Sequence, residues 1–180
     1  MKRGVGPWLI AAGVSAAAAF ALWMAPSAPP AVGRGSVAPA FELSSLDGDR
    51  VALEGFAGRV VLVNFWATWC KPCEEEMPAM ERLYRTLRND GFNLLAVSVD
   101  TDVSDVARFR DRLGLSFPIL LDPTQVTARR YQTFKFPESL LIGPDGLVIE
   151  RYIGSKDWDA PAYVKRIRRL LGRTLPSPPA

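Results

Sequence analysis

The sequence contains no histidine and only two cysteines among its 180 residues. The lack of histidine excludes Ser-His-Asp and Cys-His nucleophile pairs, and it excludes metal sites built on imidazole ligands. Two cysteines cannot complete a four-cysteine zinc or iron–sulfur site within one chain, nor can they supply the several bridges of a small secreted disulfide scaffold. We therefore expect no resident metal and no cofactor.

The chain also has little net charge outside its first residues. It carries 22 Lys and Arg against 19 Asp and Glu, and Lys2 and Arg3 are the only charged side chains in residues 1–33. Residues 34–180 therefore hold 20 basic and 19 acidic side chains. So balanced a composition argues against a nucleic-acid partner.

The first residues are unusually apolar. Residues 5–25 form a run of 21 residues without charge, which as a helix would span about 31 Å, close to the hydrocarbon core of a bilayer. Trp8 and Trp23 fall near its two ends, and Lys2 and Arg3 would stay on the cytoplasmic side. We predict that residues 1–25 are a single-pass anchor in the inner (cytoplasmic) membrane, with the soluble domain in the periplasm or otherwise outside the cytoplasm.

Two other interpretations of this segment stay open. A secretory signal has a shorter apolar region and is cut after small residues, and residues 19–21 or the stretch around residues 27–28 offer such sites. A buried soluble helix is the other alternative. After the segment, Pro, Ala, Gly and Ser dominate residues 26–36, which predicts a semi-extended linker. We expect one domain over residues 37–173 and a flexible tail over residues 174–180.

Hydrophobic patterning of the domain indicates strands that alternate with helices. The apolar run at residues 60–66 is typical of a strand buried on both faces. The other elements that the patterns predict are a hairpin at 41–53, helices at 70–89, 103–113, 124–131 and 159–171, strands at 92–99 and 117–121, and a hairpin at 139–153. This order predicts an α/β sandwich with a mixed sheet covered on both faces.

The two cysteines stand in Cys70-Lys71-Pro72-Cys73, where the buried strand turns into a helix. The spacing alone permits a zinc half-site, a structural disulfide or a redox dithiol. Zinc needs two more ligands, and a disulfide that closes so short a loop stabilises the fold by only about 2 kcal/mol. The position favours redox chemistry, because free N–H groups and the helix dipole stabilise a thiolate in the first turn.

The positions of the thiols suggest their roles. Cys70 is nearer the start of the helix, so we expect it to attack, and Cys73, one turn further, to resolve the mixed disulfide. Lys71 adds a nearby cation that tunes the thiol or only solubilises the surface. Pro72 fits the first turn, where its missing N–H costs nothing.

Residues 63–73 read Val-Asn-Phe-Trp-Ala-Thr-Trp-Cys-Lys-Pro-Cys. This segment resembles the active site of thioredoxin-fold proteins, most closely the membrane-anchored TlpA/ResA/CcmG (DsbE) group of extracytoplasmic thiol-disulfide oxidoreductases. Pro78 in the helix and the segment 136–142, which resembles the family's Pro-Glu-Thr-Phe-Leu-Ile, support the resemblance over residues 37–172. It implies a thioredoxin-like three-layer sandwich with a mixed central sheet, an N-terminal β-hairpin and a central βα-type insertion.

The resemblance also implies a substrate-binding surface. The family's proline is cis and faces the cysteines, which assigns that place to Pro137, with Phe136 before it. An ordinary proline at a strand start is the alternative interpretation. Of the two tryptophans near the cysteines, Trp66 is expected to pack in the core and Trp69 to face the substrate.

Proton transfer is expected to differ from that of cytosolic thioredoxin. A buried Asp of thioredoxin is replaced here by Asn64, which cannot titrate. ResA-like members carry a carboxylate three residues after the second cysteine, and Glu76 occupies that position. Burial would raise the pKa of Glu76 and make it a proton acceptor for Cys73. The alternative is that Glu76 only complements the helix dipole.

Other redox and binding functions fit the sequence less well. Peroxiredoxins use Pro-x-x-x-Thr-x-x-Cys, but Val63 and Ala67 occupy the Pro and Thr positions before Cys70. Copper chaperones of related fold use Cys-x-x-x-Cys with a distant His, which this chain lacks. A holdase-like binding module with incidental cysteines is a further alternative.

The function expected is therefore a thiol:disulfide oxidoreductase that acts on protein disulfides or dithiols. The resemblance favours reduction of apocytochrome c or of copper-site cysteines of an oxidase, with a membrane protein as electron donor. A general dithiol oxidase or isomerase is the alternative, because the sequence does not fix the reduction potential.

Overall fold

The computed structural model describes residues 14–15, 20, 24 and 31–172, and the chain divides after Pro30 into two units. The predicted anchor, residues 1–25, lies outside the described residues apart from those four positions, and so does the predicted tail, residues 174–180. In the described part of the chain, no helix has the length and apolarity needed to cross a membrane. The folded domain is the unit that begins at Ala31.

A seven-stranded mixed sheet forms the centre of this unit. Its spatial order is β2-β1-β5-β4-β3-β6-β7. The strands are β1 (Glu42–Ser45), β2 (Arg50–Ala52), β3 (Val60–Trp66), β4 (Phe92–Ser98), β5 (Ile119–Leu121), β6 (Glu138–Ile142) and β7 (Val148–Ile153). β3 pairs in parallel with β4 and antiparallel with β6, so it lies inside the sheet, at one of the places where the strand direction changes.

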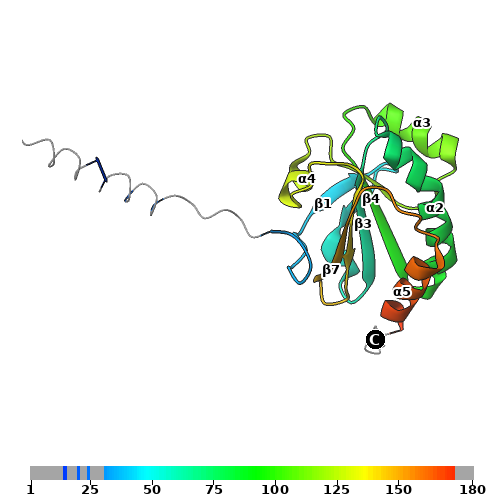
Figure 1. The fold of residues 1–180 in the computed structure, drawn as a ribbon. Helices are drawn as coiled ribbons and strands as arrows, with labels where there is room; N and C mark the ends of the chain where they lie inside the picture. The colour runs from blue at the N-terminus through cyan, green and yellow to red at the C-terminus, as the bar shows by residue number, and fades with distance from the viewer. Residues whose placement is uncertain (1–13, 16–19, 21–23, 25–30, 173–180) are drawn as a thin grey trace, which may run out of the picture. The chain divides into compact units, whose positions relative to one another are not determined.

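Helices cover the two faces unequally, as Figure 1 shows. The helices are α2 (Lys71–Leu87), α3 (Val103–Leu113), α4 (Val126–Arg130) and α5 (Pro161–Leu171), with short 3-10 helices η1 (Leu53–Phe56) and η2 (Arg88–Asp90). The parallel crossovers β3–α2–β4 and β4–α3–β5 step in the same direction across the sheet, and right-handed crossovers of this kind place their helices on one face. α5 lies on that face too, and α4 covers the other. The predicted three-layer α/β sandwich is confirmed, including the N-terminal hairpin β1–β2 and a central βα unit, β5–α4.

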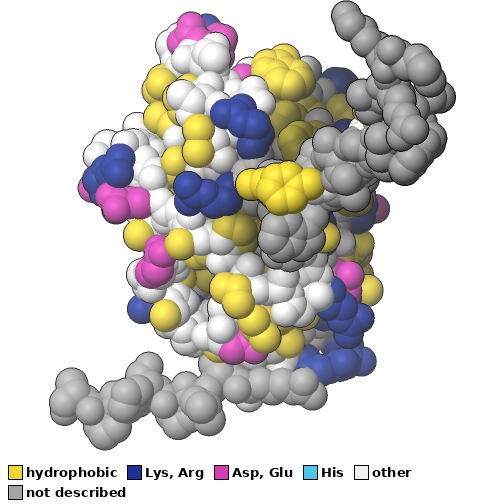
Figure 2. Space-filling view, turned by 90° about the vertical axis from the view of Figure 1, so that its left-hand side faces the viewer, with side chains coloured by type: hydrophobic (Ala, Val, Ile, Leu, Met, Phe, Trp, Pro, Cys, Tyr) yellow, Lys and Arg dark blue, Asp and Glu magenta, His cyan; other side chains and the backbone are white. Residues whose placement is uncertain are grey.

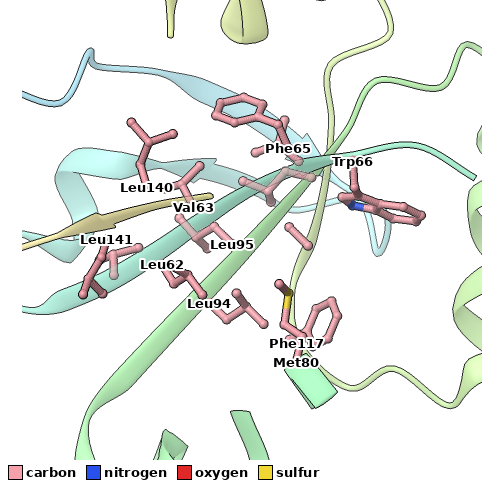
Figure 3. Packing of buried hydrophobic residues seen from close by; sticks show 14 of the residues in the cluster. Leu62, Val63, Phe65, Trp66, Met80, Leu94, Leu95, Phe117, Leu140 and Leu141 are labelled. Carbon is pink, nitrogen blue, oxygen red and sulfur yellow. The ribbon is translucent and has the colours of Figure 1, made fainter. Parts of the chain in front are cut away.

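The core is built around β3, all of whose residues are buried. Because successive side chains of a strand point to opposite faces, β3 contributes to both hydrophobic layers. Figure 3 shows this packing, with Met80 of α2 approaching leucines of the neighbouring strands. A strand held this tightly fixes the position of the residues that follow it, which include Cys70.

The structure begins the last helix later than the pattern predicted. α5 starts at Pro161 and has no acid in its first turn, whereas the prediction began it at Asp159. Asp159 instead accepts a hydrogen bond of 2.6 Å from Nε of Arg82 on α2. Its carboxylate therefore links the segment before α5 to α2 and does not cap the helix dipole.

The folded unit also begins earlier than the predicted linker allows. Residues 31–36 were expected to belong to the semi-extended tether, but Gly35 and Ser36 pair with both backbone groups of Val148 at 2.8 Å, and Val32 is buried. β7 is an edge strand with unpaired backbone groups, which the incoming chain satisfies. The Pro, Ala, Gly and Ser composition of residues 26–36 did not reveal that the end of this segment pairs with β7.

One partly buried arginine joins this N-terminal segment to the rest of the domain. The guanidinium of Arg151 on β7 donates to the carboxylate of Glu138 at 2.7 Å and to the carbonyl oxygens of Val32, Tyr131 and Gln132 at 2.6 to 2.9 Å. Glu138 is almost fully buried. The ion pair thus connects the start of the domain, the segment after α4 and the first residue of β6.

We predict that Arg151→Leu lowers the free energy of unfolding by about 3 to 5 kcal/mol, because it leaves the Glu138 carboxylate buried without a partner. Urea denaturation of the full chain measures the change. Arg50→Leu is the matched control, since Arg50 pairs with Glu42 on the exposed hairpin, where an ion pair contributes less than about 1 kcal/mol. Equal effects of the two substitutions would contradict the role given to Arg151.

Candidate active site

The two cysteines lie where β3 ends and α2 begins. Cys70 is the N-cap of α2, and its sulfur accepts a hydrogen bond of 3.3 Å from the backbone N–H of Cys73. Pro72 stands in the first turn, as predicted. The two sulfurs form a disulfide, with the Cα atoms 5.2 Å apart. The sequence therefore places a disulfide at the positive end of a 17-residue helix.

The two sulfur-bearing residues differ in accessibility. Cys70 keeps 6% of its surface exposed and Cys73 keeps none. The order matches the expectation that Cys70 is the residue a partner reaches first. Its exposure is small, so a partner must approach this edge of the domain closely to contact the sulfur.

A buried carboxylate that the sequence patterns did not single out holds the turn before Cys70. Asp100 accepts hydrogen bonds from the backbone N–H of Thr68 at 2.9 Å and from its hydroxyl at 2.7 Å. The hydroxyl of Ser98 at the end of β4 donates to the same carboxylate at 2.8 Å. Because β3 and β4 are adjacent parallel strands, their C-terminal ends meet here, and Asp100 fixes the path of the chain into the disulfide.

The predicted cis proline is confirmed at the Phe136–Pro137 bond. β6 pairs with β3 so that Glu138 lies opposite Phe65, which brings Pro137 beside the end of β3 that leads to Cys70. The Trp69 and Phe136 rings, from distant parts of the sequence, lie in edge contact with centroids 6.0 Å apart.

Trp69 is 67% exposed, so this aromatic pair presents apolar surface beside the disulfide. Trp66, by contrast, is buried and packs against Phe109 of α3, as expected for a core residue. Figure 2 shows further exposed hydrophobic side chains among Lys and Arg side chains on one face of the molecule. Apolar surface of this kind is typical of sites where proteins bind other proteins.

Lys71 is exposed beside the disulfide, and its ammonium lies 3.5 Å from the carboxylate of Glu74. Glu74 also accepts a hydrogen bond of 2.6 Å from Arg112 of α3, which lowers the pKa of this carboxyl. The positive charge of Lys71 is therefore partly balanced by a neighbouring carboxylate on the same helix.

Glu76 is the one carboxylate of the Glu74–Glu76 run that points into the protein, with 3% of its surface exposed. It lies on α2, one turn after Cys73. Its Oε1 accepts a hydrogen bond from Nδ2 of Asn64 at 3.0 Å. Its Oε2 accepts from the backbone N–H of Lys156 at 3.1 Å and from the indole N–H of Trp158 at 3.0 Å.

Burial raises the pKa of Glu76 to about 7, although the donors from Trp158, Lys156 and Asn64 act in the opposite direction. The direction and its cause are those expected from the sequence. A carboxyl group with this pKa is about half ionised at neutral pH, so it can take up or release a proton there. A solvated carboxylate that only complements the dipole would lack both the burial and the three directed donors.

Asn64 connects this carboxylate to the cis-proline side of the site. Its Nδ2 donates to Glu76 and also to the hydroxyl of Ser139 on β6, at 2.9 Å. Its Oδ1 is buried and has no hydrogen-bond partner within the part of the chain that the structure describes. Asn64 therefore holds Glu76 with an N–H donor from a side chain that cannot itself titrate.

The sequence patterns missed three partners of this site: Ser139, Lys156 and Trp158. Each lies at least 75 residues from the residue it contacts. Lys156 and Trp158 belong to no recognised motif, and Ser139 lies within the 136–142 motif, which does not reveal its contact with Asn64. The one available signal was a tryptophan within the polar stretch Lys-Asp-Trp-Asp at residues 156–159, where a large apolar side chain needs a buried partner.

A disulfide at the start of a helix, beside a cis proline and above a buried carboxyl group, defines a thioredoxin-like protein of thiol-disulfide exchange. Comparison with known proteins agrees. Residues 34–151 match the model of the AhpC/TSA family. The chain is 38% identical over 135 residues to thiol-disulfide oxidoreductase ResA of Bacillus anthracis, covering 74% of this chain and 78% of that protein. It is 42% identical over 118 residues to ResA of Geobacillus thermodenitrificans, covering 66% and 68%.

Solved structures give the same result. A putative thiol:disulfide interchange protein DsbE from Chlorobium tepidum superposes with a TM-score of 0.71 at 32% identity, over 77% of this chain and 98% of that one. The chain therefore belongs to the AhpC/TSA family, among its thioredoxin-like members. It is a thiol:disulfide oxidoreductase, and its substrates are proteins with disulfides or dithiols.

The pKa of Glu76 predicts a specific pH dependence of stability. This carboxyl group titrates near pH 7 when folded and near 4.5 when unfolded, so folding takes up a proton between these values. Stability should therefore fall as pH rises from 4.5 to 7, by about 3 kcal/mol from this group. Glu76→Gln should lack this loss.

Urea unfolding of the native chain and of Glu76→Gln at pH 4 and pH 8 measures the effect, because the change in their difference isolates Glu76. The substitution should fit, since Asn64 can rotate its amide and present its unpartnered Oδ1 to the new amide group. Parallel stability curves for the two proteins would show that Glu76 titrates normally in the folded state.

Proposed function

We propose that this oxidoreductase works as a reductant of protein disulfides outside the cytoplasm, held at the inner membrane by residues 1–25. The observation that carries the reductive direction is the acidic start of α2, where Glu74, Glu75 and Glu76 follow Cys73 directly. Carboxylates oppose a thiolate at the same helix end. A dithiol whose thiolate is poorly stabilised is a better electron donor, because strong oxidants of this fold owe their potential to a stabilised reduced form.

The proposed reaction consists of two exchanges. The Cys70 thiolate attacks one sulfur of a client disulfide, forming a mixed disulfide and releasing the other client sulfur as a thiolate. Glu76 takes the proton of the Cys73 thiol, and the Cys73 thiolate attacks Sγ of Cys70. The client leaves with both thiols free, and Cys70 and Cys73 end as a disulfide. Two electrons have then passed to the client.

The remaining site residues support these steps in the proposal. Trp69, Phe136 and Pro137 form the surface against which an extended client segment lies, so that its disulfide meets Cys70. Asn64 orients Glu76. Lys71 and Pro72 tune the first turn of α2, through a nearby charge and through its backbone geometry.

The proposed clients are apocytochrome c or proteins with copper-site cysteines, both of which need reduced thiols before they bind their metal group. A membrane protein that carries electrons across the bilayer would reduce the Cys70–Cys73 disulfide again. Resemblance to extracytoplasmic relatives and the apolar residues 5–25 support this assignment.

The reduction potential tests the direction of electron flow. Equilibration of the full chain with glutathione should give a potential below about −200 mV, in the range of reducing members of the fold. Replacing both Glu74 and Glu75 by Gln should raise the potential by about 10 to 20 mV, because it removes charges that oppose the thiolate. Glu54→Gln, on exposed η1, is the control and should have no effect.

A native potential near −120 mV would contradict the reductive assignment and would favour a general dithiol oxidase or isomerase. The isomerase alternative has one supporting observation, a TM-score of 0.72 with a putative protein disulfide isomerase from Bacteroides thetaiotaomicron at 25% identity.

The proposed location predicts that the full-length chain stays in the membrane fraction after alkaline carbonate extraction. In intact spheroplasts, added protease should digest the domain, because it lies outside the cytoplasm. Recovery of a shortened soluble protein from the periplasm would show cleavage and contradict the retained anchor. A domain protected in intact spheroplasts and digested only after lysis would contradict the location itself.

A further inference from the structure

The segment between β7 and α5, residues 154–160, contacts the buried carboxylate of Glu76 at a different oxygen from the one that β3 contacts. It provides two N–H donors to the same oxygen of Glu76, from the backbone of Lys156 and from the indole of Trp158. The other oxygen is held by Asn64 of β3. Both oxygens are thus fixed, and the indole is the only donor among these three that belongs to a side chain of the segment.

The indole of Trp158 is itself held in place. It is 1% exposed and contacts the rings of Tyr152 on β7 and Tyr163 on α5, with centroids 5.1 and 5.2 Å away. Its backbone N–H donates to the carbonyl of Lys156 at 3.0 Å. A ring packed between two others cannot rotate freely, so its N–H is aimed at Glu76.

Among the described residues, the hydrogen bonds to the Glu76 carboxylate come from uncharged groups, so the indole N–H of Trp158 has an important role. In the described part of the chain, Lys156 is the charged group that acts on Glu76; on α2, Cys73 lies one turn earlier, in the disulfide with Cys70, and Glu75 next to Glu76 is exposed. The ammonium of Lys156 donates to the carbonyl oxygens of Ile153, Gly154 and Ser155. The side chain of Lys156 therefore points to its own backbone, and its charge has the smallest of the effects that favour the carboxylate, after the neutral N–H donors, of which Trp158 has the largest.

We propose that Trp158 is a positioning residue for Glu76: its indole N–H orients the carboxylate and favours its charged form, and so sets the pH at which Cys73 is activated. The inference rests on the proton-acceptor role of Glu76 in the proposed function. Tyr152 and Tyr163 contribute indirectly, by holding the indole.

The direction in which the indole shifts the pKa of Glu76 follows from the hydrogen bond between them. An N–H that donates to a carboxylate stabilises the ionised form, and the indole lowers the pKa of Glu76 against the effect of burial. Without the indole N–H the pKa of Glu76 rises above neutral. Less of the group is then ionised at pH 7, and the Cys73 thiol loses its acceptor.

The test uses the full chain in detergent micelles, with Cys70 loaded as a mixed disulfide with thionitrobenzoate. Release of the coloured thiolate by Cys73 reports the resolving step alone, from about pH 5 to pH 9. Trp158→Phe should shift the midpoint of the rate profile upward by about one pH unit, and should slow release several-fold below the midpoint. A benzothienylalanine at position 158, which keeps the shape of the indole and replaces its N–H with sulfur, should give the same shift.

Tyr163→Phe is the matched control, because it removes only a hydroxyl and keeps the ring that contacts the indole, and its profile should equal that of the native chain. Glu76→Gln separates the two proposals. If Glu76→Gln leaves the midpoint unmoved, the proton-acceptor role fails. If Glu76→Gln abolishes the midpoint while the two Trp158 variants keep the native one, the role of Trp158 is overturned.

Discussion

The whole site depends on a single hydrogen bond at the start of α2, in which the backbone N–H of Cys73 donates to the sulfur of Cys70. The bond makes Cys70 the cap of the helix, and in the proposed function Cys70 is also the attacking thiol. It is in place because β3 is buried on both faces and because Asp100 holds the turn at Thr68. The buried sheet and the turn at Thr68 therefore fix the position of the disulfide.

A second constraint is the burial of an ionisable group inside this rigid frame. Glu76 lies among neutral donors, with burial raising its pKa and the donors lowering it. Burial outweighs the donors, and the net effect raises the pKa to about 7, which leaves the carboxyl group about half ionised at neutral pH. Either influence alone would fix the group in one protonation state, and it would then be a poor proton acceptor for a thiol. The partners of Glu76 therefore matter as much as its position in the sequence.

Patterns local in the sequence predicted most of the fold and the centre of the site. The apolar run of β3, the Cys70–Cys73 pair at a strand-to-helix junction and the place of Glu76 one turn later all follow from short-range spacing, and Pro137 followed from a motif. Trp158 and Asp100 did not, because their roles depend on contacts across 82 and 32 residues. The early start of the domain was missed for the same reason, since the partner of residues 35–36 is the distant edge strand β7.

The central claim is that electrons pass through a covalent bond between Cys70 and a client sulfur. Mass spectrometry of the Cys73→Ala chain, reduced and then mixed with a protein disulfide, tests it most directly. The account predicts a stable mixed disulfide that maps to Cys70, and none with the Cys70→Ala chain. Adducts formed equally by both variants, or by neither, would contradict it.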